Sequence, residues 1–142
     1  MAPLLKIDAL SVSFAGAPAP AVDRVSLEVS PGETLALVGE SGSGKSLTAL
    51  STVRLLPDSA EVSGSVVYDG QEMATADAAT LRRLRGNEIS FIFQEPMTSL
   101  NPLHTIEKQI GESLLLHQGL SGSAARARTL ELLDQVGIRD AE

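Results

Sequence analysis

Residues 39–46 combine the glycines and side chains that a protein needs to bind a polyphosphate, in the order Gly-Glu-Ser-Gly-Ser-Gly-Lys-Ser. Glycines at 39, 42 and 44 allow the backbone to fold into a tight loop whose N–H groups point inward, where larger side chains would obstruct them. Lys45 supplies a mobile positive charge for the β- and γ-phosphates of a nucleotide, and the Ser46 hydroxyl can bind Mg²⁺. The spacing Gly-x-x-x-x-Gly-Lys-Ser therefore predicts a P-loop that binds nucleotide phosphates.

The segments on either side of this loop have the types that a P-loop requires. The apolar run 34–38 predicts a strand that is buried on both faces, as in a parallel sheet, and that leads into the loop. A helix should leave the loop, because apolar residues recur at helical spacing up to Pro57, at Leu47, Leu50, Val53 and Leu56. A Gly/Ser-rich surface turn is the alternative, and the strand-loop-helix context favours the P-loop.

The residues before the loop predict a pair of antiparallel strands. Apolar and polar residues alternate from Leu5 to Phe14, and the alternation changes phase near Ala9, which predicts a bulge or bend near that position. A second strand over 25–30 is expected to be half-exposed. A further short strand is predicted over 63–70, between glycine turns.

A second candidate for a buried strand covers 89–93 and runs directly into Gln94. A polar residue at the end of such a strand lies at the carboxyl edge of the sheet, where the ligand sites of α/β proteins form. A plain strand-ending polar residue is the alternative interpretation of Gln94. Arginines at 82, 83 and 85 precede this strand, and we interpret them as a solvent-exposed helix end rather than as a second phosphate site.

Helices are predicted after Gln94. Thr105 can cap a helix that carries Ile106, Ile110 and Leu114 on one face. A last helix should begin within 121–123 and end at Gly137, with its apolar face at Ala127, Leu130, Leu133 and Val136. We therefore predict two parts, with residues 1–93 as a nucleotide-binding core that includes an antiparallel β-subdomain and residues 94–142 as the beginning of a helical subdomain.

Composition excludes several classes of function. The 142 residues carry a net charge of −7, which argues against a nucleic-acid partner because phosphate backbones require a basic surface. The absence of cysteine excludes disulfides, zinc–thiolate sites and thiol catalysis. No apolar run approaches the roughly 18 residues of a membrane span, and Lys6 and Asp8 interrupt the segment where a signal peptide would be apolar. We therefore expect a soluble protein that remains where it is made.

Two motifs carry a resemblance to a known family. Residues 38–46 and 93–102 closely resemble the Walker A motif and the Q-loop of ABC transporter ATP-binding subunits, and the resemblance runs from about Leu4 to Ile138. Both motifs look like those of the oligopeptide/dipeptide importer branch. Residues 101–109 are most similar to the importers with two fused nucleotide-binding domains, of the microcin C and peptide type.

The resemblance implies a P-loop NTPase of the ABC ATPase type, an α/β fold in which an antiparallel β-subdomain and a helical subdomain accompany the nucleotide-binding core. It implies that Lys45 and Gln94 act in catalysis, that Ser46 and Gln94 bind Mg²⁺, and that Phe14 stacks on adenine. A core strand aromatic is the alternative for Phe14. The implied ATP contacts are Phe14, Gly39, Glu40, Ser41, Gly42, Ser43, Gly44, Lys45, Ser46 and Leu47.

Several motifs of the family have no counterpart within residues 1–142: the signature sequence, the Walker B aspartate with its catalytic glutamate, the D-loop and the switch histidine. We therefore expect a truncated, N-terminal fragment that is inactive and poorly folded alone. The resemblance implies that the full-length protein hydrolyses ATP to drive peptide uptake from the cytoplasmic face of the membrane. Its expected partners are a second nucleotide-binding domain, permease subunits and, indirectly, a solute-binding protein. A soluble ABC-class ATPase and a non-hydrolysing ATP-binding interaction module are the alternatives.

Overall fold

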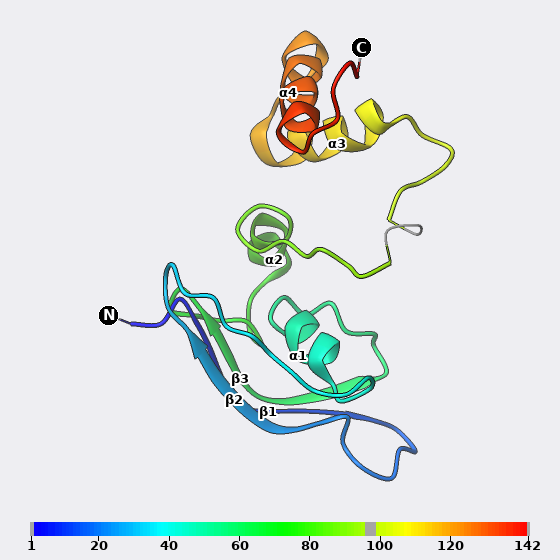
Figure 1. Ribbon diagram of the computed structural model, residues 1–142. Coiled ribbons are helices and arrows are strands. Elements are labelled where there is room, and N and C mark those ends of the chain that lie inside the picture. Colours follow the sequence, from blue (N-terminus) through cyan, green and yellow to red (C-terminus); the bar gives the residue numbers. More distant parts are fainter. Residues whose placement is uncertain (1, 96–98, 142) are drawn as a thin grey trace. The chain divides into compact units, whose positions relative to one another are not determined.

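The computed structural model describes residues 2–95 and 99–141 (Figure 1). Its contacts divide the chain into two compact units, Met1–Arg82 and Arg83–Glu142. The first unit contains the sheet and the candidate P-loop, and the second contains Gln94 and the two long helices. No helix among the described residues is both long enough and apolar enough to span a bilayer.

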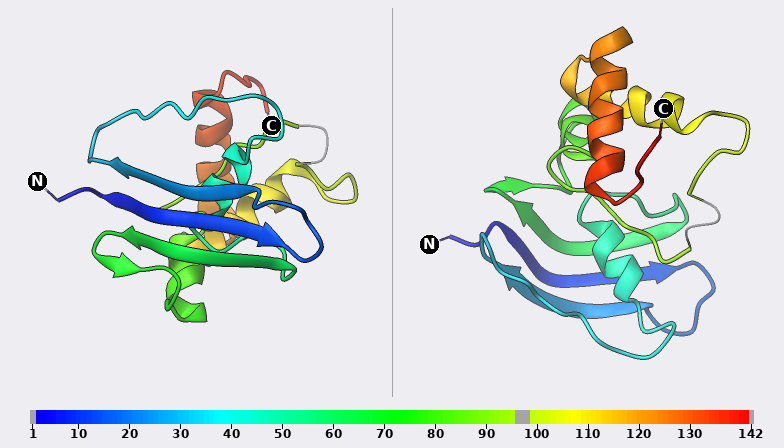
Figure 2. Two further views of the ribbon diagram at one scale, coloured as in Figure 1. Left: turned by 90° about the horizontal axis from the view of Figure 1, so that it is seen from below. Right: turned by 45° about the horizontal axis from the view of Figure 1, so that its top comes forward.

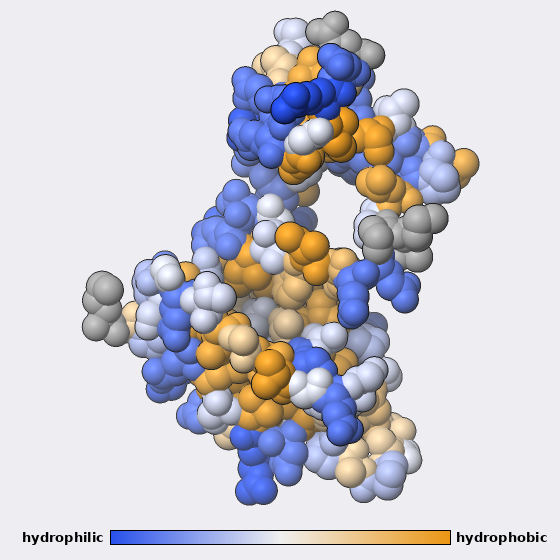
Figure 3. All heavy atoms as spheres, in the orientation of Figure 1, coloured by the Kyte–Doolittle hydropathy of each residue, from blue (hydrophilic) through white to orange (hydrophobic). Residues whose placement is uncertain are grey.

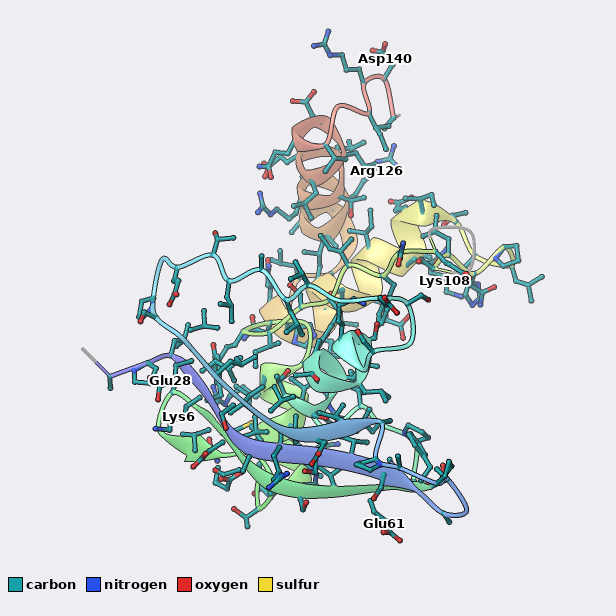
Figure 4. The ribbon with its side chains drawn as sticks, turned by 60° about the horizontal axis from the view of Figure 1, so that its bottom comes forward. Lys6, Glu28, Glu61, Lys108, Arg126 and Asp140 are labelled. Carbon is teal, nitrogen blue, oxygen red and sulfur yellow. The ribbon has the colours of Figure 1, made fainter. Side chains whose placement is uncertain are left out.

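The first unit is built on a four-stranded sheet in the order β2-β1-β3-β4 (Figure 2). Strands β1 (Leu5–Phe14) and β2 (Val22–Val29) pair antiparallel, as the sequence predicts. Strand β3 (Ala60–Tyr68) pairs antiparallel with the other side of β1, and β4 (Gln71–Glu72) forms a short hairpin with β3. The pair β1 and β2 is also joined by an ion pair between Lys6 and Glu28, whose atoms lie 2.8 Å apart (Figure 4).

The predicted bulge at Ala9 is confirmed. Ala9 has a positive φ of 48°, and the register of β1 shifts at this point against both of its neighbours. The Ser26 hydroxyl accepts a hydrogen bond from the displaced Ala9 N–H at 2.9 Å. On β3, a Cβ at Gly64 would lie 2.5 Å from the Ala9 carbonyl oxygen, so the bulge requires glycine opposite it. Because of the bulge, Ile7 and Leu10 are both buried although they are three positions apart, an odd spacing that would place them on opposite faces of a regular strand.

Helix α1 (Lys45–Ser51) lies over one face of this sheet (Figures 1 and 2). The core of the unit is apolar and includes Leu10, Val12, Val22, Val53, Val66 and Met73, all buried. The helix ends earlier than the apolar spacing predicts. Arg54 adopts a left-handed φ of 53°, and the Leu55 N–H returns to the Leu50 carbonyl at 3.0 Å, which closes the helix before Pro57.

The two predicted buried strands are wrong. Segments 34–38 and 89–93 form no strand, and Val38 and Phe93 are exposed by 85% and 61% while Ile92 is fully exposed. A strand buried on both faces needs hydrogen-bonded neighbours and covering layers. Within 2–95 and 99–141, the single bridge between Arg85 and Ile89 is the only pairing that reaches either segment. Accordingly, apolar side chains lie on the surface in the view of Figure 3.

The second unit contains two helices with the predicted caps. Helix α2 (Ala78–Leu84) spans the division between the units, and Gly86 follows it with a φ of 80°. Helix α3 (Ile106–Gln118) begins at Thr105, whose hydroxyl accepts from the Lys108 N–H at 3.2 Å. Helix α4 (Gly122–Gln135) ends with Gly137 at a φ of 85°, and the Ile138 N–H returns to the Leu133 carbonyl at 2.9 Å.

The predicted apolar face of α4 is confirmed only in part. Leu130 and Leu133 are half-buried, but Ala127 and Val136 are exposed, the latter by 72%. The buried residues of the helix are Ala125 and Thr129. Helices α3 and α4 contact each other. The buried positions 125 and 129 carry small side chains and lie four residues apart, on one face of the helix.

Candidate phosphate-binding site

The loop 39–46 depends on glycine most strongly at position 44. Gly44 is buried and has a φ of 86°, a backbone conformation that favours glycine. A Cβ at this position would lie 2.5 Å from the Ala21 carbonyl oxygen and 2.9 Å from the Val22 Cγ2 atom. The loop therefore packs against the start of β2 at a distance that only glycine allows. Gly42 also has a positive φ, of 82°, but it faces open space.

The Lys45 ammonium is held by the loop itself. Its Nζ donates to the carbonyl oxygens of Gly39 and Glu40, at 2.8 and 2.6 Å, and to the Ser43 hydroxyl at 3.2 Å. These three partners match the three donors of an ammonium group. The positive charge thus lies among the backbone groups of residues 39–43, where the P-loop pattern predicts phosphate oxygens.

Helix α1 begins directly at the loop. The Gly44 carbonyl accepts from both the N–H and the hydroxyl of Thr48, at 2.9 and 3.0 Å, and this pair fixes the first turn of the helix. Ser46 lies in this turn and is exposed, so that its hydroxyl is accessible to a cation. Leu47 is half-buried. The structure therefore brings the predicted residues 39–47 together in one loop and one helical turn.

Phe14 is the last residue of β1 and is half-buried. Val12, two residues earlier on the same face of the strand, pairs with Val22, against which Gly44 packs. The Ala21 N–H also donates to the Val12 carbonyl at 2.8 Å. The end of β1 and the P-loop are thus linked through the first residues of β2, and the stacking role of Phe14 stays a prediction.

Gln94 is exposed and lies in a bend, not at the end of a buried strand. The rings of Phe91 and Phe93, just before it, stack with centroids 6.0 Å apart. Because Gln94 belongs to the second unit and the P-loop to the first, its role beside the P-loop stays a prediction. The rest of the predicted Q-loop includes 96–98, which lie outside the described residues.

The carboxyl groups with displaced pKa values lie outside the loop. Burial alone would raise the pKa of Glu72, but hydrogen bonds from the Ser65 hydroxyl and from backbone N–H groups outweigh it and lower that pKa. Hydrogen bonds from Thr80 lower the pKa of Asp77 at the start of α2. A cavity of about 380 Å³ in the first unit is lined by Leu10, Arg54, Met73 and their neighbours, and includes no residue of the loop.

Sequence reasoning missed two features. The packing of Gly44 on Ala21 and Val22 joins residues more than twenty positions apart, and no local pattern reveals it. Gln109 makes several hydrogen bonds to the loop before α3. The nearby Thr105 cap is the one feature of the local sequence that could have indicated an ordered loop there.

The glycine-lined loop, the lysine held within it and the helix that follows define a P-loop protein. A family model described as ABC transporter matches residues 22–142, well over half of the chain. The chain therefore belongs to the ABC transporter family. This confirms the family to which the Walker A and Q-loop motifs point.

Named relatives share most of this chain. It is 60% identical over 144 residues to the peptidoglycan transport ATP-binding protein YejF of Agrobacterium fabrum, covering 99% of this chain and 26% of that protein. It is 54% identical over 142 residues to an uncharacterized ABC transporter ATP-binding protein, YejF, of Escherichia coli, covering 97% and 27%. A Brucella abortus relative, provisionally named a peptide import ATP-binding protein, is 51% identical over 143 residues, covering 99% and 43%. The chain thus spans between about a quarter and two fifths of these relatives.

A solved structure confirms the fold class. The ATP-binding cassette MJ0796, a dimer in a post-hydrolysis state with bound ADP and Pi, superposes with a TM-score of 0.75 and 26% sequence identity. The match covers 96% of this chain and 58% of that one. The α/β fold of the ABC ATPase type, with its antiparallel β-subdomain, is therefore the fold of this chain.

Proposed function

We propose that the full-length protein containing this chain is the ATP-binding subunit of an importer, which hydrolyses ATP to drive uptake of peptides or related solutes. The observation that carries this proposal is the P-loop geometry, with the Lys45 ammonium bonded within a loop that packs against β2 through Gly44. Support for the solute class comes from the relatives, whose names refer to transport of peptidoglycan or to import of peptides.

The residues present fit ATP and Mg²⁺. Backbone N–H groups of 39–44 and the Lys45 ammonium would bind the phosphates, since the ammonium can exchange its carbonyl partners for phosphate oxygens. The exposed Ser46 hydroxyl would bind Mg²⁺, which when bound neutralises charge on the β- and γ-phosphates. Gln94 would complete the metal's ligands and orient the attacking water, and Phe14 would stack on the adenine.

The proposed partners follow from the transport function. A second nucleotide-binding domain, fused or separate, would pair with this one, and permease subunits would dock near the Q-loop. A solute-binding protein would act indirectly, through the permease. The protein would therefore lie on the cytoplasmic face of the membrane as a peripheral subunit. The net charge of −7 argues against a nucleic-acid partner.

Two alternatives remain distinguishable. A soluble ABC-class ATPase acting on nucleic acid would need a basic surface, which the net charge does not favour. A non-hydrolysing module would bind ATP without phosphate release. Phosphate release by the full-length protein, measured with and without its permease subunits, separates all three functions. The non-hydrolysing module releases no phosphate, the soluble ATPase releases it at a rate that the permease does not change, and the importer's rate responds to the permease.

The decisive variant is Lys45→Ala, with Lys108→Ala on the exposed start of α3 as the matched control. Loss of a charge-assisted contact weakens phosphate binding by about 1.5–3 kcal/mol, or roughly ten- to more than a hundredfold in affinity. We expect Lys45→Ala to lose ATP binding or turnover in the full-length protein and Lys108→Ala to retain both. Unchanged ATP affinity and turnover in Lys45→Ala would overturn the proposed function.

A further inference from the structure

Helix α1, labelled in Figure 1, buries hydroxyl groups where apolar side chains are usual. Thr48, Ser51 and Thr52 are exposed by only 4%, 5% and 6%. A buried hydroxyl destabilises a fold unless it is hydrogen-bonded, and each of these donates to a backbone carbonyl three or four residues earlier, at 2.6 to 3.0 Å. The acceptor of Thr48 is Gly44, which belongs to loop 39–46, whereas the acceptors of the other two hydroxyls lie beyond the loop.

The bond from Thr48 fixes the last glycine peptide of the loop. The Gly44 carbonyl accepts from the N–H and from the hydroxyl of Thr48, at 2.9 and 3.0 Å, and so uses both of its lone pairs. The peptide bond between Gly44 and Lys45 is trans, so its C=O and N–H point in opposite directions. Because the carbonyl points along the helix toward Thr48, the Lys45 N–H points back to the side of the loop. The P-loop pattern places phosphate oxygens on that side.

Gly44 is constrained from the other side by β2. A Cβ on Gly44 would lie 2.5 Å from the Ala21 carbonyl oxygen, so its Cα already packs closely there. Glycine can adopt many backbone conformations, and this contact limits the position of Gly44 without fixing the direction of its carbonyl. The two bonds from Thr48 fix that direction. Without the hydroxyl, one of the two bonds is lost and the peptide is freer to rotate.

We propose that Thr48 is a positioning residue for ATP, whose hydroxyl holds the peptide between Gly44 and Lys45 with its N–H turned toward the phosphates. This inference rests on the proposed function, because the ligand is the ATP of that function. Thr48 is buried and lies outside loop 39–46, so it acts through Gly44 and does not touch the nucleotide. Without its hydroxyl the empty protein would populate peptide orientations that cannot bind, and the apparent affinity falls by the fraction that remains competent.

The test compares variants of the full-length protein. Thr48→Val keeps the shape of the side chain and removes the hydroxyl, whereas Thr48→Ser keeps the hydroxyl, which in serine can bond the same carbonyl. Thr52→Val is the matched control, because Thr52 lies four residues later on the same face, is also buried, and donates to Ala49 instead of the loop. Equilibrium titration with ATP and Mg²⁺ measures the Kd, phosphate release measures KM and kcat, and thermal unfolding measures the Tm.

We expect Thr48→Val to raise the Kd and the KM for ATP about three- to tenfold, the effect of one hydrogen bond, with kcat unchanged within twofold. Thr48→Ser should keep the Kd within twofold of the unaltered protein. The two valine variants should lose similar Tm, because each loses one buried bond of the same kind. Only Thr48→Val should bind ATP more weakly, which separates positioning of the loop from a general loss of stability.

An unchanged Kd in Thr48→Val would overturn the inference, and so would equal increases in Thr48→Val and Thr52→Val or in Thr48→Val and Thr48→Ser. If Thr48→Val does not fold, Thr48→Ala takes its place, since it also lacks the hydroxyl and puts no methyl group beside the Gly44 carbonyl. These outcomes leave the proposed function intact while the unaltered protein hydrolyses ATP and Lys45→Ala does not. If the unaltered protein does not bind ATP, the proposed function fails and the inference fails with it.

Discussion

Replacing Gly44 by alanine should distort the P-loop more than the same change at Gly42. Both glycines have a positive φ, of 86° and 82°, and this conformation costs a non-glycine residue about 1–2 kcal/mol. At Gly44 the new Cβ would also lie 2.5 Å from the Ala21 carbonyl oxygen, which is backbone and cannot rotate away. Overpacking of this kind adds about 1–3 kcal/mol. At Gly42 no atom lies within 4 Å of the added Cβ.

The expected difference between the two variants is therefore about 1–3 kcal/mol, the overpacking contribution alone. For a domain of about 150–250 residues, each kcal/mol of destabilisation lowers the apparent Tm by about 2–4 °C. Differential scanning fluorimetry of the full-length protein would measure it, and ATP titration would show whether displacement of the loop from β2 also weakens nucleotide binding. Equal Tm values for Gly44→Ala and Gly42→Ala would refute the reasoning, because they would mean that the contact with Ala21 does not constrain the loop.

Further predictions concern Gln94, Glu72 and the chain alone. Gln94→Ala in the full-length protein should leave ATP affinity intact while slowing phosphate release, and a collapse of ATP affinity would contradict the Q-loop role. The pKa of Glu72 lies below its usual value of 4.5, so its ionised form stabilises the fold above pH 4.5, and this stabilisation is lost as the pH falls through the lowered pKa. The urea midpoint of Glu72→Gln should therefore change less than that of the unaltered protein as the pH falls below 4.5. Residues 1–142 produced alone should release no phosphate and should associate through exposed segments such as 34–38, which size-exclusion chromatography and thermal melting would check.

Local patterns in the sequence predicted local features of the structure. The phase change at Ala9 indicated the bulge because side chains alternate with a period of two, and the Thr105 cap followed from a side chain that bonds within its own turn. The composition of loop 39–46 predicted the P-loop for the same reason. The glycines and the lysine of the motif lie within eight residues.

Features that depend on distant partners were not predictable. Segments 34–38 and 89–93 have the composition of buried strands, but composition cannot supply the neighbouring strands that would bury them. The most buried residues of α4 are Ala125 and Thr129, which the spacing of the larger apolar residues does not indicate, because burial depends on packing against distant parts of the chain. The left-handed residue that ends α1 is an arginine, Arg54, where a sequence signal would be glycine.

The bonds between Lys45 and its own loop bear on how fast a nucleotide can enter. Its ammonium is bonded to the Gly39 and Glu40 carbonyls, so the lysine helps to hold together the loop whose backbone would bind the phosphates. Entry of a phosphate would then require the ammonium to exchange these partners by rotation of one side chain, and not the ordering of an eight-residue loop. We therefore expect no slow rearrangement of the backbone to delay the binding of a nucleotide.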